Sequence, residues 1–219
     1  MFRGVTVLAW GWVVLAGVAY GAEDQTLLKQ RIHDAADLTS LDAEGVKPWH
    51  LKVSFDILPG AGRVAESGTI EEWWAGPAKR RVVYASPQFS ATELHTKDGN
   101  FRTAGAGTTP YLLQLIERGI VRPIAGAAAP EGVKFHLTTR KVREASLDCI
   151  SLEGAGAAVA STPPFSLPTY CLLRGTELVV SYRFNVQAVT RPQTGTFQGR
   201  SVATQLGVFF GAQAVASAR

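Results

Sequence analysis

The stretch "GTIEEWWAGPAKRRVVYASP", residues 68–87, predicts two strands joined by a tight turn. Side chains alternate between the two faces of a strand, so Trp73 and Trp74 are expected to point to opposite sides. An antiparallel sheet that packs on one side has one apolar face and one wet face. A tryptophan on each face therefore raises the question of what large side chains do on both sides of this sheet.

The composition is that of a folded domain with no marked charge. The 219 residues are 46% hydrophobic and 18% charged, which excludes a disordered chain and a coiled coil. The net charge of +4 is weak, and we expect the densest basic run, Lys79-Arg80-Arg81, to be a solvated strand end beside a turn. Nucleic-acid binding is not expected, because no stripe of bases with interleaved aromatics occurs.

The first residues form a targeting segment. Residues 5–19 are uncharged and apolar, and Ala19 and Gly21 are small residues where a signal peptidase cleaves. We expect residues 1–21 to be a signal peptide and residues 22–219 to be one domain of a periplasmic or secreted protein. An uncleaved membrane anchor is the alternative, although the run is short for a membrane span. After cleavage we expect no integral membrane span.

The chain has two cysteines, Cys149 and Cys171. Export favours a disulfide between them, on neighbouring strands with Cα atoms about 5.5–6 Å apart. A bridge that closes a ring of this size stabilises by roughly 3 kcal/mol in the chain-entropy model. A two-thiol metal or redox site is the alternative, but it lacks both C-x-x-C spacing and a nearby histidine.

Two segments have the periodicity or capping of a helix. Residues 24–41 carry apolar side chains at helical spacing, which predicts an N-terminal helix. Thr109 is a good N-cap and Pro110 suits the first helical position, so we expect a second helix near 109–119 that ends at Gly119.

The rest of the chain reads as strands separated by turn residues. Residues 51–57 alternate apolar and polar side chains, and Asp98-Gly99 within residues 97–100 is a strong hairpin signal. Residues 191–195 predict another hairpin loop. Residues 126–132 predict a mobile loop that folding does not require.

The predicted fold is therefore mainly β, an α+β protein. Ten or eleven strands in sequential order predict a curved antiparallel meander that forms an incomplete barrel. A helix fills part of the concave face and a cavity fills the rest. Trp73 and Trp74 would then serve opposite faces. The simpler interpretation is that each tryptophan is a good strand former beside a turn.

Catalytic motifs are missing from the sequence. The four histidines lack metal-ligand spacing, no G-x-S-x-G elbow occurs, and the glycine-rich residues 105–110 and 154–159 fail the dinucleotide-binding pattern. Glu71 and Glu72 point to opposite faces, so they cannot share a proton. His95 lies close to Glu93, but solvent-exposed neighbours on a strand are the simpler interpretation. We expect no catalytic residue, no cofactor and no metal.

The exported chain, with a helix and a long meander that a second helix interrupts, resembles the LolA/LolB-like lipoprotein-carrier superfold. In that group an incomplete barrel cradles acyl chains under helices. Local phrases are more similar to exported bacterial modules found ahead of TonB-type C-terminal domains. These phrases are "KPWHLKVSF" (47–55), "GTIEEWWAGPAKRRV" (68–82), "TKDGN" (96–100), "PTYC" (168–171) and "FQGRSVATQL" (197–206).

This resemblance implies a non-catalytic binding module for a lipid, an acyl chain or an acylated protein. Trp73, Trp74 and Phe55 are the candidates for lining its hollow. The alternative is a periplasmic interaction module that works with TonB-type envelope machinery and takes no small ligand. An enzyme such as a hydrolase is a third and less favoured class.

Overall fold

The described chain forms one antiparallel sheet, in the order β5-β4-β3-β2-β1-β12-β11-β10-β9-β8-β7-β6. The computed structural model describes residues 25–60, 63–104, 107–124, 133–142, 144–154, 168–183 and 186–219. Its helices are α1 (Gln25–Thr39) and α2 (Tyr111–Val121). The strands are β1 (Trp49–Ile57), β2 (Glu66–Gly76), β3 (Lys79–Ala85), β4 (Ser90–Thr96), β5 (Gly99–Arg102), β6 (Val133–Val142), β7 (Ala145–Gly154), β8 (Thr169–Leu173), β9 (Glu177–Arg183), β10 (Gln187–Phe197), β11 (Arg200–Phe210) and β12 (Gln213–Ala218).

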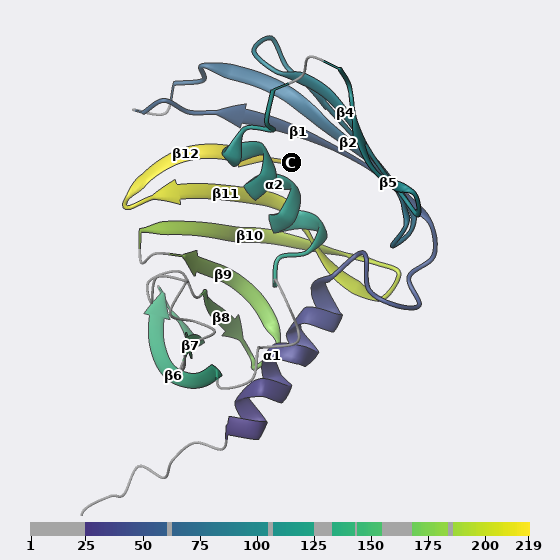
Figure 1. Ribbon diagram of the computed structural model, residues 1–219. Helices are drawn as coiled ribbons and strands as arrows, with labels where there is room; N and C mark the ends of the chain where they lie inside the picture. The colour runs from purple at the N-terminus through teal and green to yellow at the C-terminus, as the bar shows by residue number, and fades with distance from the viewer. Residues whose placement is uncertain are drawn as a thin grey trace, which may run out of the picture.

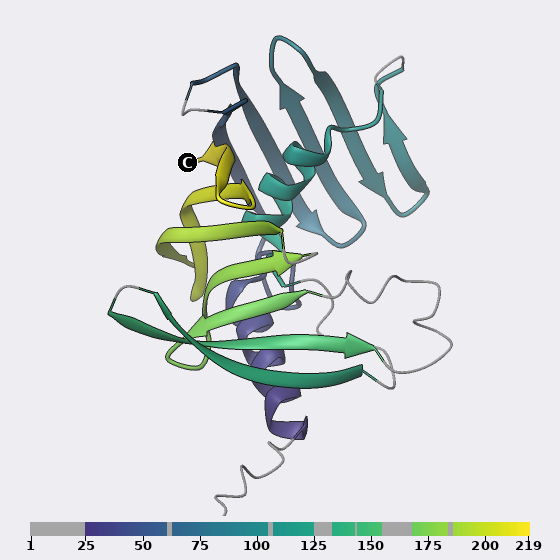
Figure 2. The ribbon, with the colours of Figure 1, turned by 90° about the vertical axis from the view of Figure 1, so that its left-hand side faces the viewer.

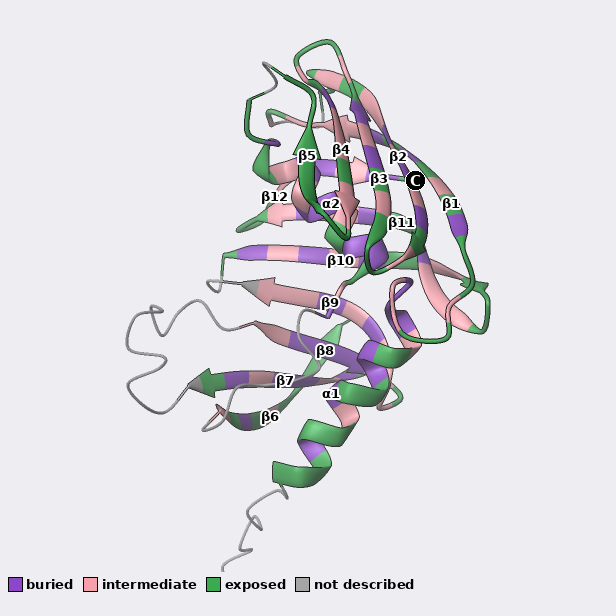
Figure 3. Ribbon diagram, turned by 45° about the vertical axis from the view of Figure 1, so that its right-hand side comes forward, coloured by how far each residue is buried: buried purple, intermediate pink, exposed green. Residues whose placement is uncertain are grey.

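The sheet curves around a concavity in which α2 lies (Figure 1). Its edge strands, β5 and β6, are not paired with each other in the described residues, so the barrel stays open. Strand β5 is exposed along its whole length (Figure 3). The predicted incomplete barrel with two helices is confirmed, with 12 strands in place of ten or eleven.

The strand order differs from a single sequential meander. Strands β1 to β5 run outward from the centre of the sheet, and β6 to β12 return from the far edge. The first and last strands therefore meet, with Phe55 opposite Ala218. Because β5 and β6 are opposite edges, the chain between them must cross the sheet, and α2 lies on this crossing.

The expected hairpin loop at residues 191–195 is wrong. These residues belong to β10, and the turn that follows is at Gln198 and Gly199, which both have positive φ. The register between β10 and β11 shifts around Pro192. Proline has no N–H to donate to a sheet, so a proline inside a strand marks an irregularity of the ladder as well as it marks a turn.

Helix α2 lies two residues beyond the predicted 109–119. Pro110 is at the N-cap and makes no side-chain capping bond, so Thr109 is not the cap. Gly119 lies inside the helix. A Cβ there would stand 2.5 Å from Leu206 Cδ1 and 3.0 Å from Val189 Cγ1. This glycine therefore lets α2 approach β10 and β11 closely, a role that its sequence neighbours do not reveal.

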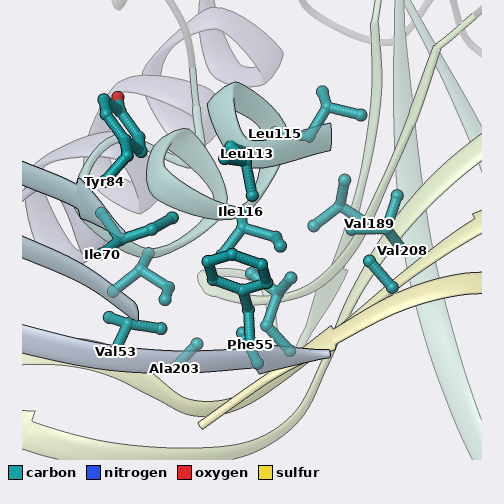
Figure 4. Close-up of a cluster of buried hydrophobic side chains, with 14 of the residues drawn as sticks. Val53, Phe55, Ile70, Tyr84, Leu113, Leu115, Ile116, Val189, Ala203 and Val208 are labelled. Carbon is teal, nitrogen blue, oxygen red and sulfur yellow. The ribbon is translucent and has the colours of Figure 1, made fainter. Parts of the chain in front are cut away.

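A buried apolar cluster joins α2 to the concave face (Figure 4). Helix α2 contributes one apolar stripe, because its buried residues recur at three- and four-residue intervals. The cluster includes Val53, Phe55, Ile70, Val82, Tyr84, Leu113, Leu115, Ile116, Val189, Ala203, Leu206 and Val208. The concave face beneath α2 is therefore filled by side chains.

Helix α1 covers the other end of the sheet, behind β6 to β9 (Figure 2). Its buried residues pack on a second apolar cluster with side chains from β6, β7, β8 and β9. The cluster includes Leu28, Ile32, Phe135, Ile150, Tyr170, Leu172 and Leu178. The predicted helix 24–41 is confirmed, ending two residues earlier at Thr39.

The expected disulfide between Cys149 and Cys171 is present. The two residues are direct partners on β7 and β8, and both side chains are buried. Their Cα atoms are 3.9 Å apart, closer than the expected 5.5–6 Å. Directly opposed residues in an antiparallel ladder can approach to about 4.5 Å, which accounts for the direction of this difference.

Two predictions fall outside the described residues: the signal peptide at 1–21 and the loop at 126–132. The assignment of residues 22–219 to one domain also stays a prediction. Neither described helix is long and apolar enough to cross a membrane.

Candidate functional site

Trp74 and Trp49 form a stacked pair on the concave side of the sheet. They are partners on β2 and β1, and their ring centroids are 6.0 Å apart at an interplanar angle of 10°. Both side chains are buried, and Trp49 Nε1 donates a hydrogen bond of 2.7 Å to the Leu41 carbonyl oxygen. Val121 of α2 packs against the same cluster. One predicted hollow-lining tryptophan therefore lies on the concave side, near a helix end.

Trp73 lies on the outer, convex face. Its ring stacks on His50 at a centroid distance of 4.7 Å, and the Arg81 guanidinium lies 5.0 Å from the ring centroid. On the same face, Arg81 of β3 is the partner of Leu94 of β4, and Leu94 is the partner of Phe101 of β5. Leu94 and Phe101 are both exposed. The two tryptophans therefore lie on opposite faces, as alternation along the strand predicts.

An apolar groove runs beside Trp49, one member of the inner tryptophan pair. It has a volume of about 220 Å³, and Leu41, Trp49, Leu51, Phe197 and Val202 are among its lining residues.

An open hollow of about 580 Å³ adjoins the apolar groove. Its walls include Trp73, Trp74 and Leu94. Trp49 and His50 belong to the walls of both spaces, so the two spaces adjoin at the ends of β1 and β2.

Phe55, the third candidate for lining a hollow, is in a different setting. Its side chain is 2% exposed and lies within the filled cluster under α2 (Figure 4). Contact between Phe55 and a ligand would require α2 to move away from the sheet. Its ligand role stays a prediction.

A buried group of charged side chains lies between β2, β3 and α2. Arg80 Nε donates a hydrogen bond of 2.6 Å to Glu72 Oε1, and Arg80 Nη2 contacts Glu117 Oε1 of α2. Glu72 is 1% exposed, and its Oε2 has no hydrogen-bond partner among the residues that the structure describes. Burial raises the pKa of Glu72 to about 7 although Arg80 opposes the shift, and burial also raises the pKa of Glu117. The pair of carboxyl groups therefore holds a proton readily near neutral pH.

Arg80 corrects the expectation that Lys79-Arg80-Arg81 is a solvated strand end. Arg80 shares its face of β3 with Val82 and Tyr84, which are buried. Alternation along the strand is the signal that could have placed Arg80 inside. Its carboxylate partner Glu117 comes from a helix 37 residues away, and no local pattern reveals that pairing.

A charged cavity of about 400 Å³ opens beside this buried group, between α2 and β3 to β5. Arg102 contacts Glu93, and Arg102 Nη2 donates a hydrogen bond of 2.6 Å to Thr109 Oγ1. His95 Nδ1 lies 2.8 Å from Asn100 Oδ1, and its Nε2 is 3.8 Å from Glu93 Oε2. The charged and titratable residues of the wall are Asp42, Arg80, Tyr84, Glu93, His95, Arg102, Glu117, Arg118 and Arg122.

The predicted separation of Glu71 and Glu72 is also observed. Glu71 is on the outer face, where His50 Nε2 lies 2.8 Å from its Oε1, and Glu72 is buried on the inner face. In the part of the chain that the structure describes, no three His, Cys, Asp or Glu side chains are grouped to hold a metal ion.

Comparisons with known proteins place this architecture. No protein-family model matches the chain, and no curated protein matches it in sequence. A solved LolA superfamily protein from Nitrosomonas europaea superposes with a TM-score of 0.51 at 10% identity, over 87% of this chain and 90% of that one. The fold is LolA-like. A DUF1329 family protein from Desulfovibrio piger superposes with a TM-score of 0.52 at 7% identity, over 89% of each chain. At such identities the likeness concerns the fold alone.

Proposed function

We propose that this protein is an exported, non-catalytic binding module that takes up the acyl chain of a lipid or of an acylated protein. The observation that carries the proposal is the apolar groove beside Trp49, together with the open hollow at Trp74 that adjoins it. The LolA-like fold supports it, because a solved LolA superfamily protein superposes on 87% of this chain and the resemblance to lipoprotein carriers implies an acyl-chain ligand.

The groove suits an alkyl chain for physical reasons. An alkyl chain needs no hydrogen bonds, and each Å² of apolar surface that it removes from water contributes about 25 cal/mol. Ligand sites are commonly about 300–1,000 Å³ with mainly apolar and aromatic walls. The apolar groove at about 220 Å³ is small alone, but it adjoins the open hollow of about 580 Å³.

The test is saturable binding of dodecyl maltoside below its micelle concentration, followed by native mass spectrometry and equilibrium dialysis. The blocking variant is Thr204→Phe, because Thr204 is exposed and lines the apolar groove. The matched control is Gln205→Phe, the next residue of β11, which lines a hollow formed with Ser54 and Asp56 instead. Binding by the wild type and by Gln205→Phe, with a loss of about tenfold or more in Thr204→Phe, is the expected result.

A module that works with TonB-type envelope machinery and takes no small ligand is the second candidate. The filled concave face under α2 favours it, because no open hollow separates α2 from Phe55. Absence of saturable dodecyl maltoside binding to the wild type would reject the acyl-chain proposal and leave this one.

A further inference from the structure

The charged cavity has more basic than acidic side chains. Four arginines line it, against the three carboxylates of Asp42, Glu93 and Glu117. Arg80, Arg102 and Arg122 each contact one of these carboxylates, and Arg80 also contacts Glu72 behind the wall. The fourth arginine, Arg118, has no carboxylate within 4 Å among the described residues.

Arg118 is the side chain that is ready for a ligand. It is exposed on α2 at the cavity, and its hydrogen bond is a long one of 3.4 Å to Gln114 Oε1. Arg118 also lies near enough to Glu117 to oppose the rise in the pKa of that carboxyl group. Arg122, the C-cap residue of α2, lines the same cavity, so two guanidinium groups border it near the end of the helix.

The charged cavity also borders the apolar part of the site. Arg80 and His95 belong to the walls of both the charged cavity and the open hollow. The open hollow adds Lys79 and Arg81 but no acid. The charged cavity and the tryptophan-lined hollow therefore share a border at Arg80 and His95.

We propose that the charged cavity binds the anionic head, a phosphate or a carboxylate, of an amphiphile whose alkyl chain lies along the open hollow and the apolar groove. This inference rests on the proposed function and adds the charge of the ligand to it. Arg118 is the main contact and Arg122 lies beside it. Guanidinium groups suit this role because they form paired, charge-assisted hydrogen bonds to phosphate and carboxylate oxygens.

The opposite charge fits the cavity poorly. A cationic head would have to compete with Arg80, Arg102 and Arg122 for carboxylates that they already contact. It would also lie beside the unpaired Arg118. A neutral head would leave Arg118 as it is and gain only the apolar contacts.

The experiment compares four amphiphiles of equal chain length, each below its micelle concentration. They are dodecyl phosphate, dodecanoate, dodecyl maltoside and dodecyltrimethylammonium, titrated by isothermal calorimetry at about 50 mM and 200 mM salt. We expect the two anionic amphiphiles to bind about 5- to 20-fold more tightly than the maltoside at low salt, with the difference shrinking at higher salt. The ratio of dodecyl phosphate to dodecanoate identifies which anion the cavity prefers.

Two variants locate the effect. Arg118→Gln is expected to remove most of the anionic preference and to leave dodecyl maltoside binding unchanged. Arg63→Gln is the matched control, because Arg63 is exposed at the β1–β2 connection, at the opposite end of these strands. Arg63→Gln should change neither the preference for anionic amphiphiles nor the affinity for dodecyl maltoside.

The outcomes separate this inference from the function on which it rests. Equal binding of all four amphiphiles would reject the proposed site for an anionic head and leave the acyl-chain site in place. Binding of none of them overturns both. If inorganic phosphate binds as tightly as dodecyl phosphate, the cavity binds an anion without any contribution from an alkyl chain. That result would reject the proposal that the ligand is an amphiphile.

Discussion

The two ends of the sheet are built differently although each is covered by one helix. At the α1 end, apolar side chains pack against β6 to β9, and the disulfide joins β7 to β8. One ion pair of this end, Arg31–Asp148, joins α1 to β7 and is partly exposed, with side chains 19% and 37% accessible. At the α2 end the apolar cluster is accompanied by Glu72, 1% exposed, and Glu117, 11% exposed, which both pair with Arg80.

This difference indicates which interactions stabilise each end of the sheet and which charged groups remain for ligand binding. Buried ion pairs contribute little net stability, because desolvation opposes their attraction. A disulfide and a packed apolar layer stabilise without that cost. We infer that an apolar layer stabilises the fold at both ends, with the disulfide added at the α1 end, and that the buried charges at the α2 end contribute little to stability.

The largest expected effect is on the core under α2. Phe55→Ala should lower the free energy of unfolding by about 3–5 kcal/mol, because Phe55 is fully enclosed by that cluster. Urea unfolding measures it. The control is Phe101→Ala on β5, where the side chain is 55% exposed and the cost should stay below about 1 kcal/mol. A similarly small loss for Phe55→Ala would show that Phe55 lines an unfilled hollow after all.

The second effect concerns the α1 end. Replacing both Cys149 and Cys171 by Ala should lower the free energy of unfolding by roughly 3 kcal/mol, since the bridge spans a separation of 22 residues. The same unfolding experiment measures the loss. Labelling of the unfolded, non-reduced wild type should find no free thiol, and two labelled thiols per chain would contradict the bridge.

Local patterns in the sequence predicted the elements better than they predicted the pairing of distant residues. Alternation gave the opposite faces of Trp73 and Trp74, and helical spacing gave α1. The return of β12 to β1 and the contact of Arg80 with Glu117 join segments far apart in the chain. Periodicity carries no information about such partners, so the charged cavity could not be predicted.

Turn-forming residues predicted the structure only where a single local conformation is compatible with them. Asp98-Gly99 gave the β4–β5 hairpin, since Gly99 has a φ of 138° that other residues avoid. Pro192 fits a turn and a strand irregularity equally well, and the structure has the irregularity. The prediction failed there because both structures tolerate a missing N–H.

The third prediction tests whether the buried acids under α2 weaken the fold as pH rises. The folded-state pKa of Glu72 is about 7 against an ordinary value of 4.5, so the folded protein holds this proton more tightly. The contribution of Glu72 to the free energy of unfolding is therefore fully present below about pH 4.5 and is lost as the pH rises to about 7. The loss should be on the order of 2–3 kcal/mol and level off above pH 7.

Glu72→Gln should remove most of that fall and be more stable than the wild type at pH 8. Urea unfolding at pH 5, 6, 7 and 8 measures both slopes. Glu71→Gln is the control, because Glu71 lies on the outer face beside His50 and Lys52. A pH slope that persists in Glu72→Gln would assign the titration to another group.

The fourth prediction tests how closely α2 approaches the sheet. Gly119→Ala would gain up to about 1 kcal/mol of helix propensity on an open surface. Here its Cβ would meet Leu206 and Val189, so overpacking should prevail and lower stability by about 1–2 kcal/mol. Thermal unfolding measures the sign. A more stable variant would show that α2 is free to shift, which would also make Phe55 accessible.

The smallest expected effect separates the outer face from the inner one. Trp73→Ala removes the stack on His50 and the contact with Arg81, on a surface that water reaches. Cross-strand pairs and exposed cation–π contacts each contribute up to about 1 kcal/mol, so we expect a loss of about 1 kcal/mol. Trp74→Ala, on the same strand but 6% exposed, should cost about 3–5 kcal/mol. Urea unfolding of both variants measures the two losses in the free energy of unfolding. Equal losses would mean that a further part of the protein covers the outer face and packs on Trp73 as α2 packs on Trp74.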